Sequence, residues 1–413
     1  MLIPTTAKHY REKPLLMDTL HFPPAKIPSS ALLDITSYEA ENKTVIPSIL
    51  EIKNRIFTTS GRASIALALE HAGVSAGDEV LIPAYHCEAM VAPAKWRQAK
   101  IVFYRIKHDT KADIEDIAAK ISTKTRAIIV THYFGFEQDL KPIRQLCNQH
   151  KIILIEDCAH AMFGLSSGQP IGSTGDYAIG SCMKFLPIYE GGMLLSTTRN
   201  INNIKLSSPS LKFQLKSAFN ALESSIYFGR LGRLGSAAKI LLKIKDVLWG
   251  RLKRTQMMND GSKVGPSSSE GGFGLDEDWI YKKISYFSHW VINHSSLQHV
   301  IEQRRHNYQR MYKVLSKLPN CRVMFENLPE HTVPWVFPIY VDQAERYFVP
   351  LKMQEVPVWR FGEFLDPEVT IDVCPISVEY SKHIFQLPCH QSLTKTDIDW
   401  MLETITRIFT EQQ

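Results

Sequence analysis

The stretch IILIEDCAH at residues 152–160 joins an apolar run to two adjacent acidic residues. Consecutive aliphatic residues with a polar end are typical of a buried strand in a parallel sheet. Ligands of open α/β sheets bind outside the carboxyl ends of the strands, so Asp157 is placed to face a cofactor, where a carboxylate would keep a pyridine nitrogen protonated. The alternative is that Asp157 only caps the next helix, and this stretch alone does not separate the two.

Segments of two kinds alternate around this stretch, from about residue 56 to residue 200. Short runs of β-forming apolar residues alternate with stretches of helical spacing, which predicts an α/β fold with a mostly parallel central sheet covered by helices. The expected strands lie at 79–85, 101–106, 127–134, 152–157, 178–182 and 193–196. The expected helices lie at 63–72, 89–98, 114–121 and 140–150.

The rest of the chain divides by composition. Residues 201–256 combine helical apolar spacing with many basic residues, and residues 257–274 are rich in Gly, Ser and Pro, which is typical of a flexible loop. Helical and β-like patterns then resume and predict a smaller C-terminal α+β domain at 275–413. We expect residues 1–55 to pack with that domain, and residues 56–256 to form a large α/β domain with a basic helical insertion.

The basic residues of the insertion gather at residues 230–254. They could dock on an acidic membrane surface or on a partner. The simpler interpretation, which we prefer, is a pair of surface helices with a solvated charged side. The residues concerned are Arg230, Arg233, Lys239, Lys243, Lys245, Arg251 and Lys253.

The overall composition is that of a globular protein with more than one domain. The chain has 413 residues, 44% of them hydrophobic and 22% charged, and its net charge is +6. So small an excess, without a recognition motif, argues against nucleic-acid binding. The seven scattered cysteines form neither a disulfide framework nor a zinc motif, and residues 1–16 have no apolar signal-peptide core, so we expect a soluble, cytoplasmic protein.

Two further segments have residue types suited to carbonyl and phosphate chemistry. Lys184 follows a β-like run, and lysine is the side chain that forms Schiff bases with carbonyl groups. Ser181 could bind a phosphate, and so could the turn Ser60-Gly61-Arg62, because the start of a helix leaves backbone N–H groups free at its positive end. Taken singly, Lys184 also fits a surface charge, and the turn also fits a simple helix cap.

Several other residues have simpler explanations than a site. Cys158 and Cys182 are expected to be small apolar fillers, because a buried cysteine is more often structural than nucleophilic. His289 and His294 lie five residues apart on an expected helix, and scatter explains them better than a metal-ligand pair. We therefore expect no metal site.

Five segments follow one another in a recognisable order. They are GDEVLIP at 77–83, THYFG at 131–135, EDCAH at 156–160, Lys184 a short distance before EGG at 190–192, and LPCHQSLT at 387–394. In this order they resemble the DegT-type sugar aminotransferases, a branch of the fold-type I enzymes that depend on pyridoxal 5'-phosphate (PLP). The resemblance covers most of residues 55–200 and 279–409.

The resemblance implies a role for each matching residue. Lys184 would carry PLP as a Schiff base and move a proton between substrate and cofactor, Asp157 would bind the ring nitrogen, and His160 would contact the ring or its 3-oxygen. The other implied contacts are Ser60, Gly61, Arg62 and Ser181 with the phosphate, Tyr85 or His86 with the ring face, and Arg360 with the substrate or the amino donor's carboxylate.

The implied activity is the transfer of an amino group from an amino acid, with glutamate as the expected donor, to a keto-sugar. The resemblance further implies a nucleotide-linked sugar, a pathway of polysaccharide or secondary-metabolite biosynthesis, and a homodimer that shares its cofactor site between subunits.

Departures from the family pattern keep two alternatives open. Residues 180–183, GSCM, are shorter than the family's Ser-Phe-x-x-x, and Tyr281-Lys282-Lys283 is the nearest match to its Asn-Tyr-Arg segment. The loop at 85–88 also differs. One alternative is a PLP enzyme of this fold with a non-sugar substrate. The other is a non-catalytic regulatory homologue, which the presence of Lys184 and Asp157 disfavours.

Overall fold

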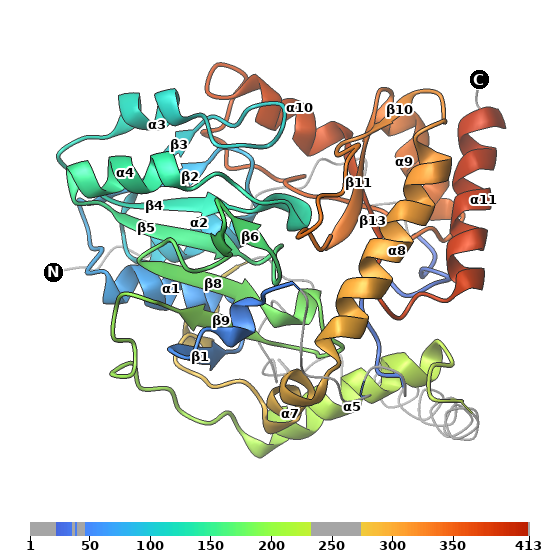
Figure 1. Cartoon of the computed structure of the whole chain (residues 1–413), viewed down its shortest axis with the longest axis horizontal. Helices are drawn as coiled ribbons and strands as arrows, with labels where there is room; N and C mark the ends of the chain where they lie inside the picture. Colours follow the sequence, from blue (N-terminus) through green and yellow to red (C-terminus); the bar gives the residue numbers. More distant parts are fainter. Residues whose placement is uncertain (1–21, 35–37, 39–45, 233–273, 412–413) are drawn as a thin grey trace, which may run out of the picture.

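A computed structural model of the chain describes residues 22–34, 38, 46–232 and 274–411 (Figure 1). Its large sheet contains β1 (Arg55–Thr58), β2 (Glu79–Pro83), β3 (Lys100–Tyr104), β4 (Thr125–Thr131), β5 (Ile153–Cys158), β8 (Tyr177–Ser181) and β9 (Gly192–Leu195). The strands lie in the order β1-β9-β8-β5-β4-β2-β3. Only β9 runs against its neighbours in this sheet, and the other strands point the same way. The predicted mostly parallel α/β sheet is therefore confirmed.

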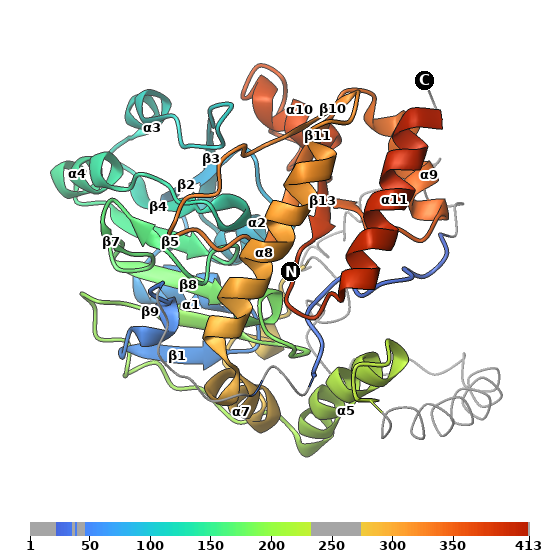
Figure 2. The ribbon, with the colours of Figure 1, turned by 45° about the vertical axis from the view of Figure 1, so that its right-hand side comes forward.

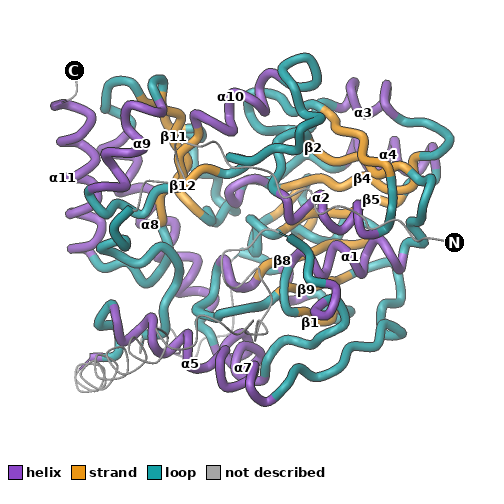
Figure 3. The backbone as a smooth tube through the Cα atoms, turned by 180° about the vertical axis from the view of Figure 1, so that it is seen from behind, coloured by secondary structure: helices purple, strands orange, loops and turns teal. Residues whose placement is uncertain are grey.

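Helices cover both faces of the large sheet. On one face lie α1 (Gly61–His71) and α2 (Glu88–Trp96), which are in front in the view from behind (Figure 3). On the other lie α3 (Ile114–Lys120) and α4 (Lys141–His150). Because helices shield both faces, β2 and β8 are buried at every position. The predicted helices of this half are confirmed as well.

A second, smaller sheet lies toward the C-terminus. It is antiparallel, in the order β10-β11-β13-β12, with strands β10 (Cys321–Val323), β11 (Val336–Val341), β12 (Trp359–Arg360) and β13 (Ile384–Pro388). Its helices are α9 (Ala344–Met353), α10 (Pro375–His383) and α11 (Lys395–Glu411). This is the small C-terminal α+β part that the sequence predicts.

The long helix α8 (Leu297–Leu315) runs between the two sheets (Figure 2). It packs against β10, β11 and α11, and one of its side chains, Arg304, reaches backbone carbonyls of the large sheet's loops. Near the other end of the chain, Lys26 N donates to Glu355 O, and Leu32 exchanges two hydrogen bonds with the Ser392 hydroxyl. The residues at 26–32 therefore lie against the smaller sheet's layer.

Parts of two sequence predictions lie outside the described residues. The basic run at 230–254 is described only as far as Gly232, and the expected loop at 257–274 only at Gly274. The described part of the insertion forms α5 (Leu211–Tyr227), which packs against α7 (Tyr286–His294). Among the helices that the structure describes, none has the length and apolar character needed to cross a bilayer.

Gly135 allows the two halves to approach closely. Its φ is +105°, and a Cβ there would lie 2.4 Å from the Val333 carbonyl oxygen and 2.8 Å from Pro334 Cα. Beside it, Trp335 N donates to Phe134 O at 2.8 Å. Only glycine combines this backbone conformation with this contact.

We predict that Gly135→Ala lowers the free energy of unfolding by about 3 kcal/mol, because the new methyl group meets backbone atoms that cannot move independently. Gly77→Ala is the matched control, since Gly77 also has a positive φ of +92° but nothing within 4 Å of an added Cβ. It should cost about 1 kcal/mol, the backbone strain alone. Chemical denaturation measures both, and equal losses would contradict the steric explanation.

Candidate functional site

Lys184 lies in the short 3-10 turn Cys182–Lys184, which follows directly from the carboxyl end of β8. The side chain is only partly exposed, and its Nζ lies 4.4 Å from the centre of the Trp335 ring. Burial lowers the pKa of Lys184, while the nearby Cys87 and Asp157 act in the opposite direction. A lowered pKa raises the fraction of neutral amine, which is the form that attacks a carbonyl.

Asp157 lies near the carboxyl end of β5, the strand next to β8 in the sheet. Its carboxylate accepts a hydrogen bond from Ala159 N at 2.9 Å and one from the Thr131 hydroxyl at 3.4 Å. Burial raises the pKa of Asp157, which the Ala159 N–H and the charge of Lys184 partly oppose. The residues after β5 form a turn and no helix begins there, so the helix-cap interpretation is wrong.

His160 is buried beside these two residues. Its ring stacks on Trp335 at 4.0 Å between centroids and meets the edge of Phe361 at 4.8 Å. Burial lowers the pKa of His160 well below its ordinary value, so the imidazole is neutral. Its Nδ1 has no hydrogen-bond partner among the described residues, which leaves a polar atom available to a bound molecule.

The predicted phosphate residues come together at the start of α1. Ser60 caps the helix through its hydroxyl, which accepts from Ala63 N at 3.3 Å. A Cβ on Gly61 would lie 3.7 Å from Ser181 Cβ, so the helix start and the end of β8 are in contact. The guanidinium of Arg62 donates to Gly274 O, and burial lowers its pKa. Backbone N–H groups at a helix start, a hydroxyl and a guanidinium are groups that suit an anion.

The loop after β2 differs from the expectation. His86 stacks on Phe103 at 4.8 Å, its Nδ1 bonds Ala84 O at 2.9 Å, and its Nε2 accepts from Asp366 N at 3.0 Å. Because both ring nitrogens are hydrogen-bonded in this way, His86 connects its own loop with the loop that contains Asp366. The ring-face role predicted for Tyr85 or His86 is therefore not supported for His86.

Tyr85 lies inside an aromatic cluster, with ring centroids 5.4 Å from Tyr133 and 5.0 Å from Phe361. The residue of this loop that lies with Lys184 is Cys87. Burial raises the pKa of its thiol, and the charges of Lys184 and Asp157 both act on it. No local pattern in the sequence distinguishes Cys87 from its neighbours, since side-chain direction in a loop depends on its tertiary contacts.

Arg360 is not among the residues gathered around Lys184. Its guanidinium lies 4.1 Å from the Phe348 ring and pairs with Glu345 at 3.0 Å, so the side chain is turned toward α9. The next residue, Phe361, faces His160 instead. The predicted contact of Arg360 with a substrate carboxylate therefore has no support in this arrangement, because neighbouring residues of an extended segment point to opposite sides.

Arg304 on α8 hydrogen-bonds the two backbone segments that carry Lys184 and Trp335. No pattern in the sequence singled it out. This fully buried side chain uses all five of its N–H groups: Nε donates to Gln391 at 3.0 Å, and the others donate to the carbonyl oxygens of Pro334, Trp335, Lys184 and Phe185 at 2.8 to 3.3 Å. Burial lowers its pKa to about 10. One guanidinium thus positions the backbone of Lys184 relative to that of Trp335.

We predict that Arg304→Lys lowers the free energy of unfolding by about 3 kcal/mol. A lysine has three donors on one nitrogen and leaves buried carbonyl oxygens without a partner. Arg305→Lys is the matched control, because Arg305 is more exposed and bonds two carbonyl oxygens, those of Pro329 and Thr332. Urea denaturation of both variants would test this, and a loss no larger than that of the control would refute it.

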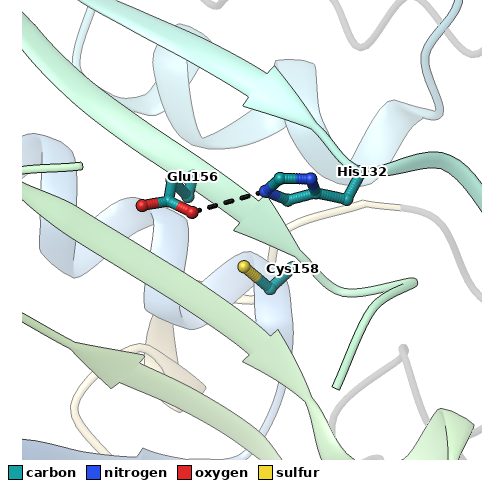
Figure 4. Close-up of side chains that lie close together, drawn as sticks. All are labelled: His132, Glu156 and Cys158. Atoms are coloured by element: carbon teal, nitrogen blue, oxygen red, sulfur yellow. Dashed lines mark hydrogen bonds and ion pairs between the residues drawn. The ribbon is translucent and has the colours of Figure 1, made fainter. Parts of the chain in front are cut away.

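His132, Glu156 and Cys158 form a compact buried group beside Asp157 (Figure 4). Their ligand atoms lie within 4.8 Å of one another, a set that could hold a metal ion. Hydrogen bonds already use the ring nitrogens of His132 and the carboxylate oxygens of Glu156, however. Glu156 accepts from His132 Nε2 at 3.3 Å and from the backbone N–H groups of 172, 174 and 175, while His132 Nδ1 accepts from Gln138 N. The group holds the end of β5, and with it Asp157, in place.

Glu190, in the EGG segment, is buried where the Lys184 loop meets α5 and α7. One carboxylate oxygen accepts from Ser285 N at 3.0 Å and from the Ser217 hydroxyl at 3.4 Å, and the other has no partner among the described residues. Burial raises the pKa of Glu190 to about 7, against the lowering effect of these serine hydrogen bonds.

This shift predicts a pH dependence of stability. Because the folded pKa lies above the ordinary 4.5, protonated Glu190 stabilises the fold, and this contribution is complete below pH 4.5 and lost as the pH rises through 7. Its size is up to about 3 kcal/mol. Glu190→Gln should remove this part of the pH dependence, whereas Glu115→Gln, at an exposed carboxylate, should not. Chemical denaturation at several values between about pH 4 and pH 8 measures the free energy of unfolding of each variant. The prediction is wrong if the stability of Glu190→Gln depends on pH as steeply as that of the wild type.

Tyr281-Lys282-Lys283, the nearest match to the family's Asn-Tyr-Arg segment, packs against its own chain. The Tyr281 hydroxyl donates to Glu70 on α1 at 2.6 Å, and Lys283 N donates to Ser207 O at 2.9 Å. Lys283 also forms a bridge with Thr58, at the end of β1 next to Ser60.

Solved structures of aminotransferases have the same fold as this chain. The aminotransferase of Psychrobacter cryohalolentis has a TM-score of 0.60 at 18% identity, over 87% of this chain and 88% of that one. Spr1654 of Streptococcus pneumoniae, solved in a PLP form and a PMP form, has a TM-score of 0.61 at 15% and 16% identity, over 95% and 96% of this chain and 99% and 100% of that one.

Residues 36–227 match the DegT/DnrJ/EryC1/StrS aminotransferase family, which confirms the resemblance seen in the sequence. GDP-perosamine synthase of Vibrio cholerae is 31% identical over 159 residues, which are 38% of this chain and 43% of that protein. L-glutamine:2-deoxy-scyllo-inosose aminotransferase of Streptomyces kanamyceticus is 36% identical over 141 residues, 33% of each chain. These matches thus span less than half of the relatives' length.

Proposed function

We propose that this protein is a PLP-dependent aminotransferase that transfers an amino group from an amino acid to a keto-sugar. The observation that carries this proposal is Lys184, with a lowered pKa, facing Asp157 across the ends of two adjacent strands. The printed names of the relatives, a GDP-perosamine synthase and glutamine-dependent inosose aminotransferases, support a sugar-like acceptor. They also support glutamine beside glutamate as the donor, and a nucleotide-linked sugar as one class of acceptor.

The residues present fit PLP. Asp157 would hold the ring nitrogen, Nδ1 of His160 is free for a ring oxygen, and the start of α1 with Ser181 offers donors to the phosphate. Bound to the lysine, PLP supplies an electron sink that stabilises negative charge on the substrate carbon.

The chain's own residues then have distinct tasks. The Lys184 amine gives and takes the proton at the substrate carbon, and its lowered pKa suits both directions. Asp157 would hold the ring nitrogen of PLP and favour a positive charge on it, and the Ala159 N–H keeps the carboxylate oriented. The Trp335 indole lies over the amine and limits access of water to it.

We further propose a cytoplasmic homodimer. The seven cysteines are all described and all free, which supports a reducing compartment. The resemblance to the family supports the dimer, because there a neighbouring subunit completes the cofactor site.

The absorption spectrum of the purified protein, with PLP added, tests the proposal. We expect a visible band of lysine-bound PLP that Lys184→Ala abolishes and that Lys107→Ala, at an exposed lysine, leaves intact. Addition of L-glutamate or L-glutamine should bleach the band as the amino group passes to the cofactor. If no band forms with added PLP, the cofactor assignment is wrong, and if a band forms that no common amino acid bleaches, the transamination is wrong.

A further inference from the structure

The amine of Lys184 has an aromatic partner and no hydrogen-bonding one. Among the residues that the structure describes, Nζ forms neither a hydrogen bond nor an ion pair, and it lies 4.4 Å from the centre of the Trp335 ring. A buried ammonium without an acceptor is costly, whereas the face of an indole attracts a cation through the ring quadrupole. The Trp335 ring is therefore placed to stabilise the charged form of this amine.

The position of the Trp335 ring is fixed by the fold. The ring stacks on His160 at 4.0 Å between centroids, with 29° between the planes, and the backbone N–H of Trp335 donates to Phe134 O at 2.8 Å. Arg304 donates to the carbonyl oxygens of both Trp335 and Lys184, at 2.8 and 3.1 Å. Because one guanidinium joins the two backbones, the indole and the lysine turn keep a constant relative position.

Other titratable groups act on the amine from three further elements. Cys87, at the start of α2, and Asp157, on β5, favour the ammonium, and Arg62, at the start of α1, disfavours it. His160 is neutral, because burial holds its pKa well below the ordinary value, so it does not repel a cation at the same indole. The ring adds an attraction that acts on the charged amine alone and that has a defined direction.

We propose that Trp335 is a positioning residue that holds the Lys184 amine, as an ammonium over the indole, whenever the lysine is not bonded to PLP. The inference rests on the proposed function, because amino transfer requires the lysine to leave the cofactor and to return to it. An amine held at the ring remains in the site, where it moves the proton at the substrate carbon. The attraction is comparable to a single hydrogen bond, so the amine is held without being trapped.

A tryptophan with a fluorinated benzene ring, placed site-specifically at position 335, tests the contact. Fluorine withdraws electron density and weakens the attraction for a cation, while the shape of the side chain is nearly kept. In the PLP-free protein, competitive acetylation at several pH values, followed by mass spectrometry, measures the pKa of the Lys184 amine. We expect this pKa to fall by roughly half a unit to one unit. The matched control is the same replacement of Trp400, whose ring centre lies 4.7 Å from Lys26 Nζ, and it should leave Lys184 unchanged.

The direction of the shift separates the roles that Trp335 could have. A fall in the pKa supports the inference, because the charged amine has lost part of its partner. A rise would mean that the ring acts only by shielding the amine from water, and no change would mean that it does not act on the amine. Either of these two results overturns the inference.

A second measurement follows the contact during amino transfer. With PLP bound, the fluorinated protein should need roughly two- to fivefold more L-glutamate or L-glutamine to bleach half of the visible band, because the displaced amine is held less well. An unchanged concentration would overturn the role of Trp335 in the reaction. If the wild type forms no band, the proposed function is wrong, whereas the pKa comparison in the PLP-free protein still decides whether Trp335 holds the amine.

Discussion

One buried guanidinium connects the parts of this protein on which the site depends. Arg304 on α8 donates to the carbonyl oxygens of Lys184 and Phe185 on one side and of Pro334 and Trp335 on the other. Its positive charge is balanced by these carbonyl dipoles and by the Gln391 amide oxygen, and all five donors are used, so its burial is tolerated. The position of the Lys184 turn relative to the second sheet follows from this residue.

The same low-polarity surroundings prepare the site for chemistry. Burial lowers the pKa of Lys184 and raises that of Asp157, so both groups shift toward their neutral forms. A bound molecule of the right charge or hydrogen-bonding type would stabilise Lys184 and Asp157. It would also satisfy Nδ1 of His160, which has no hydrogen-bond partner among the described residues. Glu156, whose oxygens are fully occupied, keeps the neighbouring strand end rigid instead. Adjacent acidic residues of one strand thus have different tasks because they point to opposite faces.

Local patterns predicted six of the seven strands of the large sheet, all except β1, and two of the site's central residues. Apolar runs and helical spacing locate β2, β3, β4, β5, β8 and β9 and the helices between them, because a parallel sheet covered on both faces requires such runs. Lys184 and Asp157 follow from the same patterns, since both lie at strand ends. The same patterns did not predict the contacts of His86, Arg360 and Cys87. The direction of these side chains depends on tertiary contacts, such as that of His86 with Asp366 and that of Arg360 with Phe348.

The amino-acid order alone was sufficient for the α/β class, for the family resemblance and for the chemistry that a lysine and an aspartate at strand ends can support, because these depend on short-range periodicity and residue type. Tertiary contacts decided which side chains surround Lys184. Trp335 and Arg304 reach it from segments more than a hundred residues away. Periodicity reports that a residue is apolar or faces one side of a helix, but which surface covers it depends on the packing of the whole chain.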